Sequence, residues 1–292
     1  MLTLFHGDLA LQLAPELGGA VCGFTYRGRD VLRPTLNGAH DPLEAAAFTL
    51  VPYANRIAKG SFQFGGRAVR IAANAPGETY PLHGQGWREP WDSRVVSDRQ
   101  AVLSYAHDSD SWPWSYEVEQ AFTLHDHGLR IDLTLRNTCR TPMPAGLGWH
   151  PYFLRRPGAR LRACVRGAWL VDDEGIPTSH VADARFGDWS RGEAIERNSA
   201  IDHCLTGWSG LAELDLPSER LSVTIAASDA MRWLHLYIPR GQDFFCVEPV
   251  SHMPDAVNRS EPHAATGLTV LEPGASLAVW IEVGIREVSA DQ

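Results

Sequence analysis

The amino-acid sequence predicts an all-β protein, built as one large antiparallel β-sandwich. Two observations lead to this fold class. Apolar and polar residues alternate with a period of two in many short segments, as in strands that are buried on one face. The chain also contains 26 glycines and 19 prolines among 292 residues, which favours frequent turns over long helices. Many short strands separated by turns are typical of sandwiches and barrels.

The strands are expected wherever alternating segments occur. The strongest hairpin signal lies at 61–73, where Gly65 and Gly66 separate two such segments and can adopt the positive φ angles of a primed turn. The two longest strands are expected at 116–124 and 129–137. The remaining strands are expected at 2–5, 9–15, 20–26, 31–34, 94–97, 101–106, 221–227, 233–239, 243–250, 268–273 and 276–288.

Helical periodicity is scarce in this chain. Only 41–48 and the stretch around 191–198 could form short helices. Charged residues, glycine and proline are dense between about 155 and 210, where we expect a long loop of the sandwich. A length near 300 gives a prior of about two domains. No repeat, low-complexity tract or linker divides the chain, however, so we expect a single domain over residues 1–292.

Charge and cysteine usage narrow the cellular setting. The chain has 26 Lys+Arg against 35 Asp+Glu, a formal net charge of −9, which argues against nucleic acid and anionic membranes as partners. No apolar run approaches the ~20 residues that span a bilayer, and we expect no signal peptide. The five cysteines are widely spaced and form no C-x-x-C, so we expect reduced thiols, no structural zinc and a cytoplasmic location. We also expect a monomer or homodimer.

Missing motifs exclude several kinds of active site. The chain lacks the glycine-rich nucleotide motifs, the G-x-S-x-G elbow and the H-E-x-x-H zinc motif. One H-x-H occurs, formed by His125 and His127 around Asp126. Because it adjoins Gly128 in a predicted turn, we expect exposed side chains there. We therefore predict no metal site.

The candidate functional residues are ionisable side chains flanked by large hydrophobic residues and by Pro or Gly. Pro and Gly stop or bend strands, and so can direct a side chain from a strand into a concave surface. The segments with this pattern are 51–57, 81–84, 148–153, 201–204 and 244–249.

Glu248 is the most informative candidate. It follows the apolar run 244–247, where a carboxylate is costly to bury unless it has a partner. Burial would raise the pKa of Glu248 toward the range of a general base. A structural ion pair with an arginine is the alternative. Taken singly, His150 and His83 fit hydrogen-bonded core residues better than catalytic ones, and Arg56 could be an ordinary exposed residue.

Five motifs together resemble those of the aldose 1-epimerase, or galactose mutarotase-like, family. They occur in the order expected for that family, and the resemblance covers about residues 10 to 285. It implies the galactose mutarotase-like supersandwich, a sugar bound on the concave face, and no cofactor. The motifs are Asn55-Arg56-Ile57, Leu82-His83-Gly84, His150-Pro151-Tyr152-Phe153, Asp202-His203-Cys204 and Glu248 after its hydrophobic run.

The resemblance also implies roles for individual residues. Glu248 would be the general base, His150 the general acid, and His83 would assist near the ring oxygen and the anomeric centre. The residues implied to hold sugar hydroxyls are Arg56, Asp202 and Asn55. Interconversion of α and β anomers requires removal of the C1 hydroxyl proton and protonation of the ring oxygen. The expected function is therefore aldose 1-epimerase activity on a free monosaccharide.

Departures from the galactose enzymes leave the sugar unidentified. Leu154-Arg155 follow the third motif, Gln85-Gly86 follow the second, and Val-Ser-His follows Glu248-Pro249. One alternative is a hexose-6-phosphate epimerase, which would need further cations at the cleft. The candidates for those cations are Arg88, Arg155 and Arg156. Another alternative is a sugar-binding protein without turnover.

Three residues near or similar to Glu248 complete the candidates. His252 and Asp255 lie just beyond it and could line the same cleft. Glu272 stands in a similar Glu-Pro context, but Gly274 marks a turn there, so we expect Glu272 to be exposed.

Overall fold

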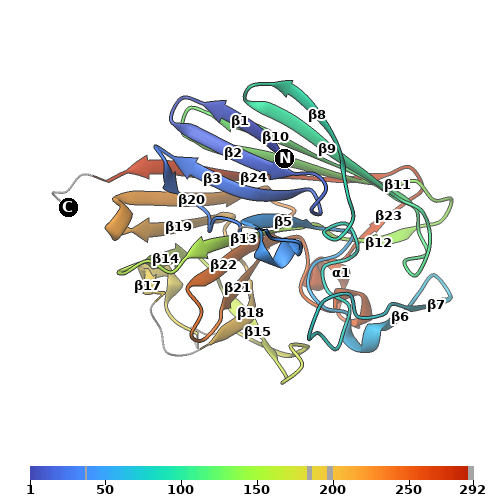
Figure 1. The fold of residues 1–292 in the computed structure, drawn as a ribbon. Helices are drawn as coiled ribbons and strands as arrows, with labels where there is room; N and C mark the ends of the chain where they lie inside the picture. The colour runs from blue at the N-terminus through green and yellow to red at the C-terminus, as the bar shows by residue number, and fades with distance from the viewer. Residues whose placement is uncertain (37, 183–185, 196–199, 289–292) are drawn as a thin grey trace.

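Two large antiparallel sheets form the body of the molecule in the computed structural model, which describes residues 1–36, 38–182, 186–195 and 200–288 (Figure 1). In this part of the chain the first sheet has the order β1-β2-β3-β5-β13-β22-β21-β18-β15-β16, with β4 paired to β3. Its strands are β1 (Leu2–His6), β2 (Leu9–Ala14), β3 (Ala20–Tyr26), β4 (Arg29–Asp30), β5 (Ala47–Leu50), β13 (Gly148–Leu154), β15 (Gly167–Val171), β16 (Pro177–Val181), β18 (Ile201–Thr206), β21 (Trp233–Ile238) and β22 (Phe244–Val250).

The second sheet has the order β17-β14-β19-β20-β24-β11-β10-β9-β8. Its strands are β8 (Asp92–Ser97), β9 (Gln100–His107), β10 (Tyr116–His125), β11 (Gly128–Asn137), β14 (Arg160–Ala163), β17 (Glu193–Ala194), β19 (Leu211–Leu216), β20 (Leu221–Ala227) and β24 (Ser276–Glu287). Two small sheets pair β6 (Ser61–Phe64) with β7 (Arg67–Arg70), and β12 (Met143–Ala145) with β23 (Thr269–Leu271).

Helical structure is confined to single turns in the described residues. The 3₁₀ turns are η1 (Pro42–Glu44), η2 (Ala58–Gly60), η3 (Trp189–Arg191), η4 (Pro217–Glu219) and η5 (Ala256–Asn258), and the α-helical turn is α1 (His263–Thr266). No helix in these residues is long and apolar enough to cross a membrane.

The main hydrophobic core joins the two large sheets. Leu11 and Phe153 from the first sheet and Phe122 and Val283 from the second are fully buried in one cluster. A buried polar link crosses between the sheets as well, because the Thr49 hydroxyl on β5 donates to the side-chain oxygen of Gln120 on β10 at 2.6 Å. The predicted antiparallel β-sandwich is therefore confirmed.

The central strands of the first sheet are buried on both faces. Figure 1 shows the green β13 lying between β5 and β22, which come from opposite ends of the chain. On β13, Trp149 and Phe153 pack into the main core, whereas Tyr152 packs into a second cluster on the opposite face. Six of the seven residues of β22 are buried in the same way. Odd-numbered residues on these strands therefore face the main core, and even-numbered residues face the opposite side of the sheet.

The hairpin predicted at 61–73 is present as β6 and β7, and its turn residues Gly65 and Gly66 have φ angles of +56° and +75°. The two longest predicted strands correspond to β10 and β11. The strand predicted at 31–34 is wrong, because β4 covers Arg29–Asp30 and ends before it. The helix predicted at 41–48 is also wrong: η1 ends at Glu44 and β5 begins at Ala47. The capping hydrogen bond of Asp41 stabilises a single 3₁₀ turn. The buried residues that follow pair with neighbouring strands as β5.

The long loop predicted between about 155 and 210 is not what the structure contains. The described residues of this region include β14 to β18, which extend both large sheets. Their shortness and their charged neighbours concealed them in the sequence. The short helix predicted around 191–198 is absent from its described part, where η3 ends at Arg191 and β17 follows. Residues 196–199 lie outside the described residues.

Candidate active site

A row of side chains crosses four neighbouring strands on the face of the first sheet that is turned away from the main core. His235 on β21 is directly opposite Glu248 on β22, and Cys204 on β18 is opposite His235. On the other side of β22, Tyr152 is opposite Cys246, and this register brings His150 opposite Glu248. Sheet pairing alone therefore aligns His150, Glu248 and His235.

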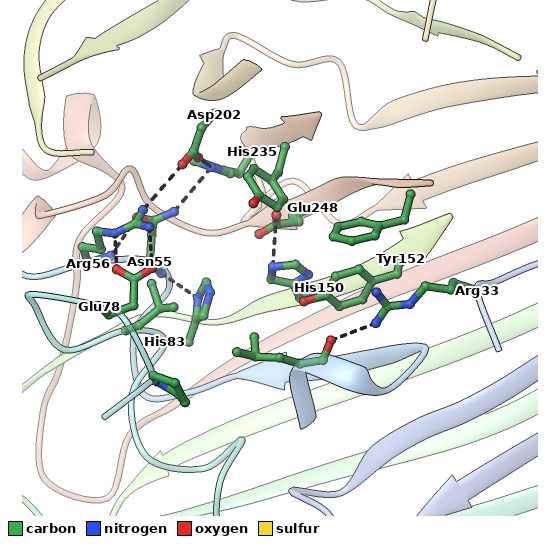
Figure 2. A pocket seen from close by; sticks show the side chains of 15 residues that line it. Arg33, Asn55, Arg56, Glu78, His83, His150, Tyr152, Asp202, His235 and Glu248 are labelled. Atoms are coloured by element: carbon green, nitrogen blue, oxygen red, sulfur yellow. Dashed lines mark hydrogen bonds and ion pairs between the residues drawn. The ribbon is translucent and has the colours of Figure 1, made fainter. Parts of the chain in front are cut away.

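His150 and Glu248 form the centre of this row, and both are almost fully buried, with 6% and 2% exposure. The Nε2 atom of His150 lies 3.4 Å from Oε1 of Glu248 (Figure 2). Burial raises the pKa of Glu248 to about 8 and lowers the pKa of His150 to about 3. At neutral pH the pair therefore holds one proton, which either residue can carry.

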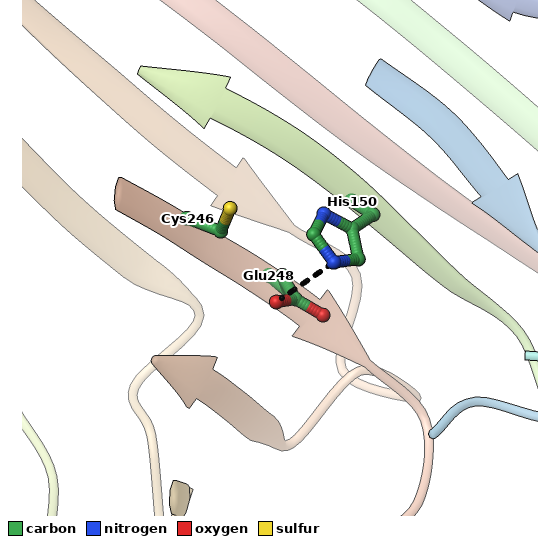
Figure 3. A group of neighbouring side chains, drawn as sticks. All are labelled: His150, Cys246 and Glu248. Carbon is green, nitrogen blue, oxygen red and sulfur yellow. Dashed lines mark ion pairs between the residues drawn. The ribbon is translucent and has the colours of Figure 1, made fainter. Parts of the chain in front are cut away.

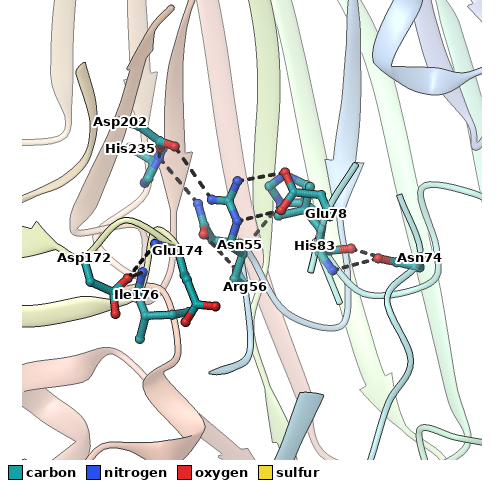
Figure 4. Close-up of polar contacts among 11 residues, drawn as sticks. Asn55, Arg56, Asn74, Glu78, His83, Asp172, Glu174, Ile176, Asp202 and His235 are labelled. Atoms are coloured by element: carbon teal, nitrogen blue, oxygen red, sulfur yellow. Dashed lines mark hydrogen bonds and ion pairs between the residues drawn. The ribbon is translucent and has the colours of Figure 1, made fainter. Parts of the chain in front are cut away.

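Two loop segments bring further polar residues against the row. The backbone N–H of Asn55 donates to Nδ1 of His83 at 3.0 Å, and the N–H of His83 donates to the carbonyl of Asn55 at 3.0 Å. Both residues have left-handed φ angles near +60°, an uncommon conformation that surrounding contacts must hold. Asn74 supplies such contacts by bonding the backbone of Leu82 and Gly84 on either side of His83 (Figure 4).

The protonation of His83 follows from these contacts. Burial lowers the pKa of His83 well below its ordinary value, so its ring is neutral. Because Nδ1 accepts a hydrogen bond from the Asn55 backbone, the ring proton resides on Nε2. The ring centres of His83 and His150 are 5.3 Å apart, edge to face. His83 is therefore a neutral donor beside the central pair.

A network of charged groups closes one end of the site. Arg56 donates from Nε and Nη2 to the two oxygens of Glu78 at 2.8 and 2.9 Å, and its Nη1 lies 3.7 Å from Asp202. Asp202 also contacts Nε2 of His235 at 2.7 Å. Burial alone would raise the pKa of Asp202, but the hydrogen bond with His235 and the nearby cations lower it to about 2. Asp202 is therefore ionised.

These groups surround a cavity of about 290 Å³ (Figure 2). Arg33 lies at the end away from Arg56, with its guanidinium 3.8 Å from the ring centre of Tyr152. Nη2 of Arg33 donates to the carbonyls of Leu43 and Ala45. No carboxylate lies within ion-pair distance of Arg33 in the described residues. The full lining is Arg33, Leu43, Asn55, Arg56, Pro76, Glu78, Leu82, His83, His150, Tyr152, Asp202, His235, Tyr237, Phe244 and Glu248.

Comparison with known proteins agrees with this fold. Residues 1–284 match the family described as aldose 1-epimerase. The chain belongs to the aldose 1-epimerase family. Its relative YphB of Escherichia coli K12, whose function is uncharacterised, is 30% identical over 94% of each chain. A second relative of the same strain, YihR, is also uncharacterised and is 24% identical over 93% of this chain and 89% of its own.

Solved structures of similar fold include several described by the same family. A crystal structure from E. coli K12, provisionally described as an aldose 1-epimerase, has a TM-score of 0.90 at 29% identity over 98% of each chain. A galactose mutarotase-like protein from Clostridium acetobutylicum has a TM-score of 0.88 at 17% identity, over 98% of this chain and 95% of its own. These matches confirm the predicted galactose mutarotase-like fold and the family resemblance.

The structure brings all six site residues predicted from the family resemblance to the lining of one cavity: Glu248, His150, His83, Arg56, Asp202 and Asn55. The prediction that His252 and Asp255 could line the same cleft is wrong, because neither belongs to that lining. Both hold backbone instead: His252 Nε2 accepts from the N–H of Ala54, and Asp255 accepts from the N–H of Ala58. Glu272 is exposed as predicted.

Residues that the aldose 1-epimerase motifs did not suggest also line the cavity. The most notable are His235, Glu78 and Arg33. The sequence did contain an indication that His235 is buried, because it stands between Leu234 and Leu236 in a predicted strand. The same kind of apolar context had selected Glu248. Glu78 and Arg33 had none, because they reach the cavity only through contacts between distant segments.

A group of three side chains could be considered for a metal ion. One ligand atom from each of His150, Cys246 and Glu248 lies within 4.8 Å of the others (Figure 3). The group fits a metal poorly, since burial raises the pKa of the Cys246 thiol well above its ordinary value and metals bind the thiolate. Cys246 also lies outside the cavity lining. The absence of a resident metal stays a prediction. The H-x-H at 125–127 is exposed as expected.

Proposed function

We propose that this protein interconverts the α and β anomers of a free monosaccharide. The observation that carries this proposal is the buried pair of His150 and Glu248, with 3.4 Å between Nε2 and Oε1, at the wall of a small polar cavity. Mutarotation needs an acid and a base acting on neighbouring oxygen atoms of one ring. A pair that holds one proton between two groups meets that need.

In the proposed reaction, Glu248 as carboxylate removes the proton of the C1 hydroxyl. Protonated His150 gives its proton to the ring oxygen, and the C1–ring oxygen bond breaks to leave an open-chain aldehyde. The pair then holds its proton on Glu248. After rotation about C1–C2, the ring oxygen attacks the other face of the aldehyde. His150 regains the proton of the ring hydroxyl, Glu248 returns its proton to the C1 oxygen, and the enzyme is restored.

The other cavity residues are proposed to bind and orient the sugar. His83 carries its proton on Nε2, so it can donate a hydrogen bond to an oxygen near the reacting centre. Arg56 and Asp202 are both charged, and charge-assisted hydrogen bonds to sugar hydroxyls are stronger than neutral ones. Asn55 holds His83 in place through two backbone hydrogen bonds. Together these contacts would fix the ring relative to the acid–base pair.

The test is exchange NMR on an equilibrium mixture of anomers, with a panel of hexoses, pentoses and deoxysugars. We expect the wild-type protein to accelerate exchange of at least one free aldose far above its rate in buffer. The exposed-site variant Glu272→Gln should match wild type. An exchange rate equal to the buffer rate for every sugar would overturn the proposal. Binding without acceleration would instead identify a sugar-binding protein.

One observation favours a second candidate, an epimerase of an anionic sugar such as a hexose 6-phosphate. Arg33 lines the cavity, and no carboxylate lies within ion-pair distance of its guanidinium in the described part of the chain. The three arginines suggested by the sequence do not serve this purpose, since none lines the cavity. Arg88 pairs with Asp41, Arg155 donates to the Pro239 carbonyl, and Arg156 pairs with Glu219. Including hexose 6-phosphates in the exchange panel distinguishes the two candidates.

A further inference from the structure

His235 is a buried histidine in the cavity wall that the proposed acid–base reaction does not use. Its exposure is 4%, and it is directly opposite Glu248 on the neighbouring strand. Side chains of directly opposed residues on one sheet face lie about 5 Å apart at Cβ. A charge on His235 would therefore act on Glu248 at close range.

The contact with Asp202 indicates that His235 carries such a charge. The Nε2–Oδ1 distance of 2.7 Å is typical of a hydrogen bond between an imidazolium and a carboxylate. Arg56 lies on the far side of Asp202, with its Nη1 atom 3.7 Å from Oδ2, which keeps that carboxylate ionised. The side chain of Asn55 approaches the same nitrogen of His235, at 3.4 Å.

Groups from several elements act on His235. Burial alone would lower its pKa, but hydrogen bonds to Asp202 and Cys204 and the charges of Glu248 and Asp202 raise the pKa of His235 to about 10. The charged and titratable groups around it are Glu248 on β22, Asp202, His203 and Cys204 on β18, Tyr237 on β21, His150 on β13, and His83 and Arg56 from the loops.

We propose that His235 is a positioning residue: held as an imidazolium by Asp202, it faces Glu248 and favours the carboxylate form that begins ring opening. This inference rests on the proposed function for its catalytic meaning. The physical claim is that His235 carries a positive charge that acts on Glu248. It rests on the geometry of the adjacent strands β18, β21 and β22.

The proposal gives Asp202 a second purpose. In addition to contacting the sugar, its carboxylate fixes the charge of the residue next to the base. Burial raises the pKa of Glu248, and His235 is the largest influence in the opposite direction. For unit charges on the order of 5 Å apart at an effective dielectric constant near 20, the influence amounts to about two pH units. The base would otherwise hold its proton well above neutral pH.

The variant His235→Gln tests this inference, because glutamine can still hydrogen-bond Asp202 but has no charge. The matched control is His127→Gln, at an exposed turn position. The measurement is the ¹³C NMR titration of the Glu248 carboxyl, identified as the signal missing in Glu248→Gln. We expect the pKa of Glu248 to rise by at least one pH unit in His235→Gln and to stay unchanged in the control. An unchanged value in His235→Gln would overturn the proposal.

A second measurement on the wild-type protein covers the case in which the variant does not fold. In protein with ¹⁵N-labelled histidine, we expect an imidazolium signal to remain at pH 8.5, because the contacts of His235 raise its pKa to about 10. The absence of any imidazolium at that pH would overturn the proposal. Neither titration depends on turnover, so a failure of the proposed function would be seen separately, in the exchange assay.

The kinetic consequence separates a charge effect from a structural one. Above its pKa, Glu248 leaves the acid–base pair without a proton, so kcat/KM should fall on the alkaline side. In His235→Gln we expect this alkaline limb to move up by at least one pH unit. A uniform loss of activity at every pH, with the limb unmoved, would show a merely structural role and contradict the proposal.

Discussion

Replacing Glu248 with glutamine is expected to remove activity and, at the same time, to stabilise the fold at alkaline pH. Glutamine has nearly the same shape but no proton to exchange, so the loss in kcat/KM should be about 10²–10⁴-fold. The gain in stability arises because a carboxylate that is 2% exposed is costly to keep ionised.

The size of the stability effect follows from the raised pKa of Glu248, about 8 against an ordinary 4.5. Each unit corresponds to about 1.4 kcal/mol, so ionised Glu248 lowers the free energy of unfolding by on the order of 4 to 5 kcal/mol. The pKa of Glu248 is higher in the folded protein than in the unfolded chain, so protonated Glu248 costs the folded state nothing below about pH 4.5. As the pH rises from 4.5 toward 8, the free energy of unfolding falls by this amount of about 4 to 5 kcal/mol. Glu248→Gln has no such loss.

The assay is urea unfolding of wild type and Glu248→Gln at pH 5 and pH 8, beside the exchange assay. The variant should exceed wild type by about 1 kcal/mol at pH 5 and by about 4 kcal/mol at pH 8. Glu272→Gln, at an exposed glutamate, should match wild type in both assays. An equal difference at the two pH values would refute the raised pKa of Glu248. Full exchange activity in Glu248→Gln would remove that residue from the mechanism.

Three further predictions concern the same site. His150→Asn should lower kcat/KM by about 10²–10⁴-fold without unfolding the protein, because asparagine cannot transfer a proton; wild-type exchange rates would exclude His150 as the acid. The wild-type kcat/KM should be level from pH 5 to about 8 and then fall, as the pair loses its single proton near the raised pKa of Glu248; a steady rise through pH 9 would contradict this. Gly84→Ala should lower both thermal stability and activity, since φ is +74° and the added Cβ would lie 2.0 Å from the Val51 carbonyl, beside His83; an unchanged melting temperature would show that the loop can adapt.

Strands with one buried and one exposed face could be predicted from the sequence. The segment 116–124 alternates apolar and charged residues, and β10 (Tyr116–His125) has the matching alternation of burial. The central strand β13 could not be predicted in this way. In β13 (Gly148–Leu154) both faces are buried, so no period-two pattern exists in the sequence. The same reason explains the wrong helix at 41–48, which contains the start of the fully buried β5.

The site could be predicted in part, and the limit has a physical cause. A carboxylate or imidazole within an apolar run must be buried, and a buried ionisable group needs either a partner or a function. This argument selects Glu248 and His150, and it applies equally to His235. Arg33 and Glu78 gave no comparable signal, because polar residues in loops are ordinary on a surface. Only the folded chain shows that these two face a cavity.

The acid–base geometry depends on strand register, and the residues that hold the register are not polar. On β22, Phe245 and Val247 pack into the main core, which turns Cys246 and Glu248 to the opposite face. A shift of one residue would exchange the two sets and bring Val247 opposite His150. The apolar residues thus position the base. By contrast, Arg33 and the segments around Arg56 and His83 reach the cavity through loops, whose sequence can change without moving the strands. We infer that the sheet determines the chemistry of this site and that the loops determine which sugar it accepts.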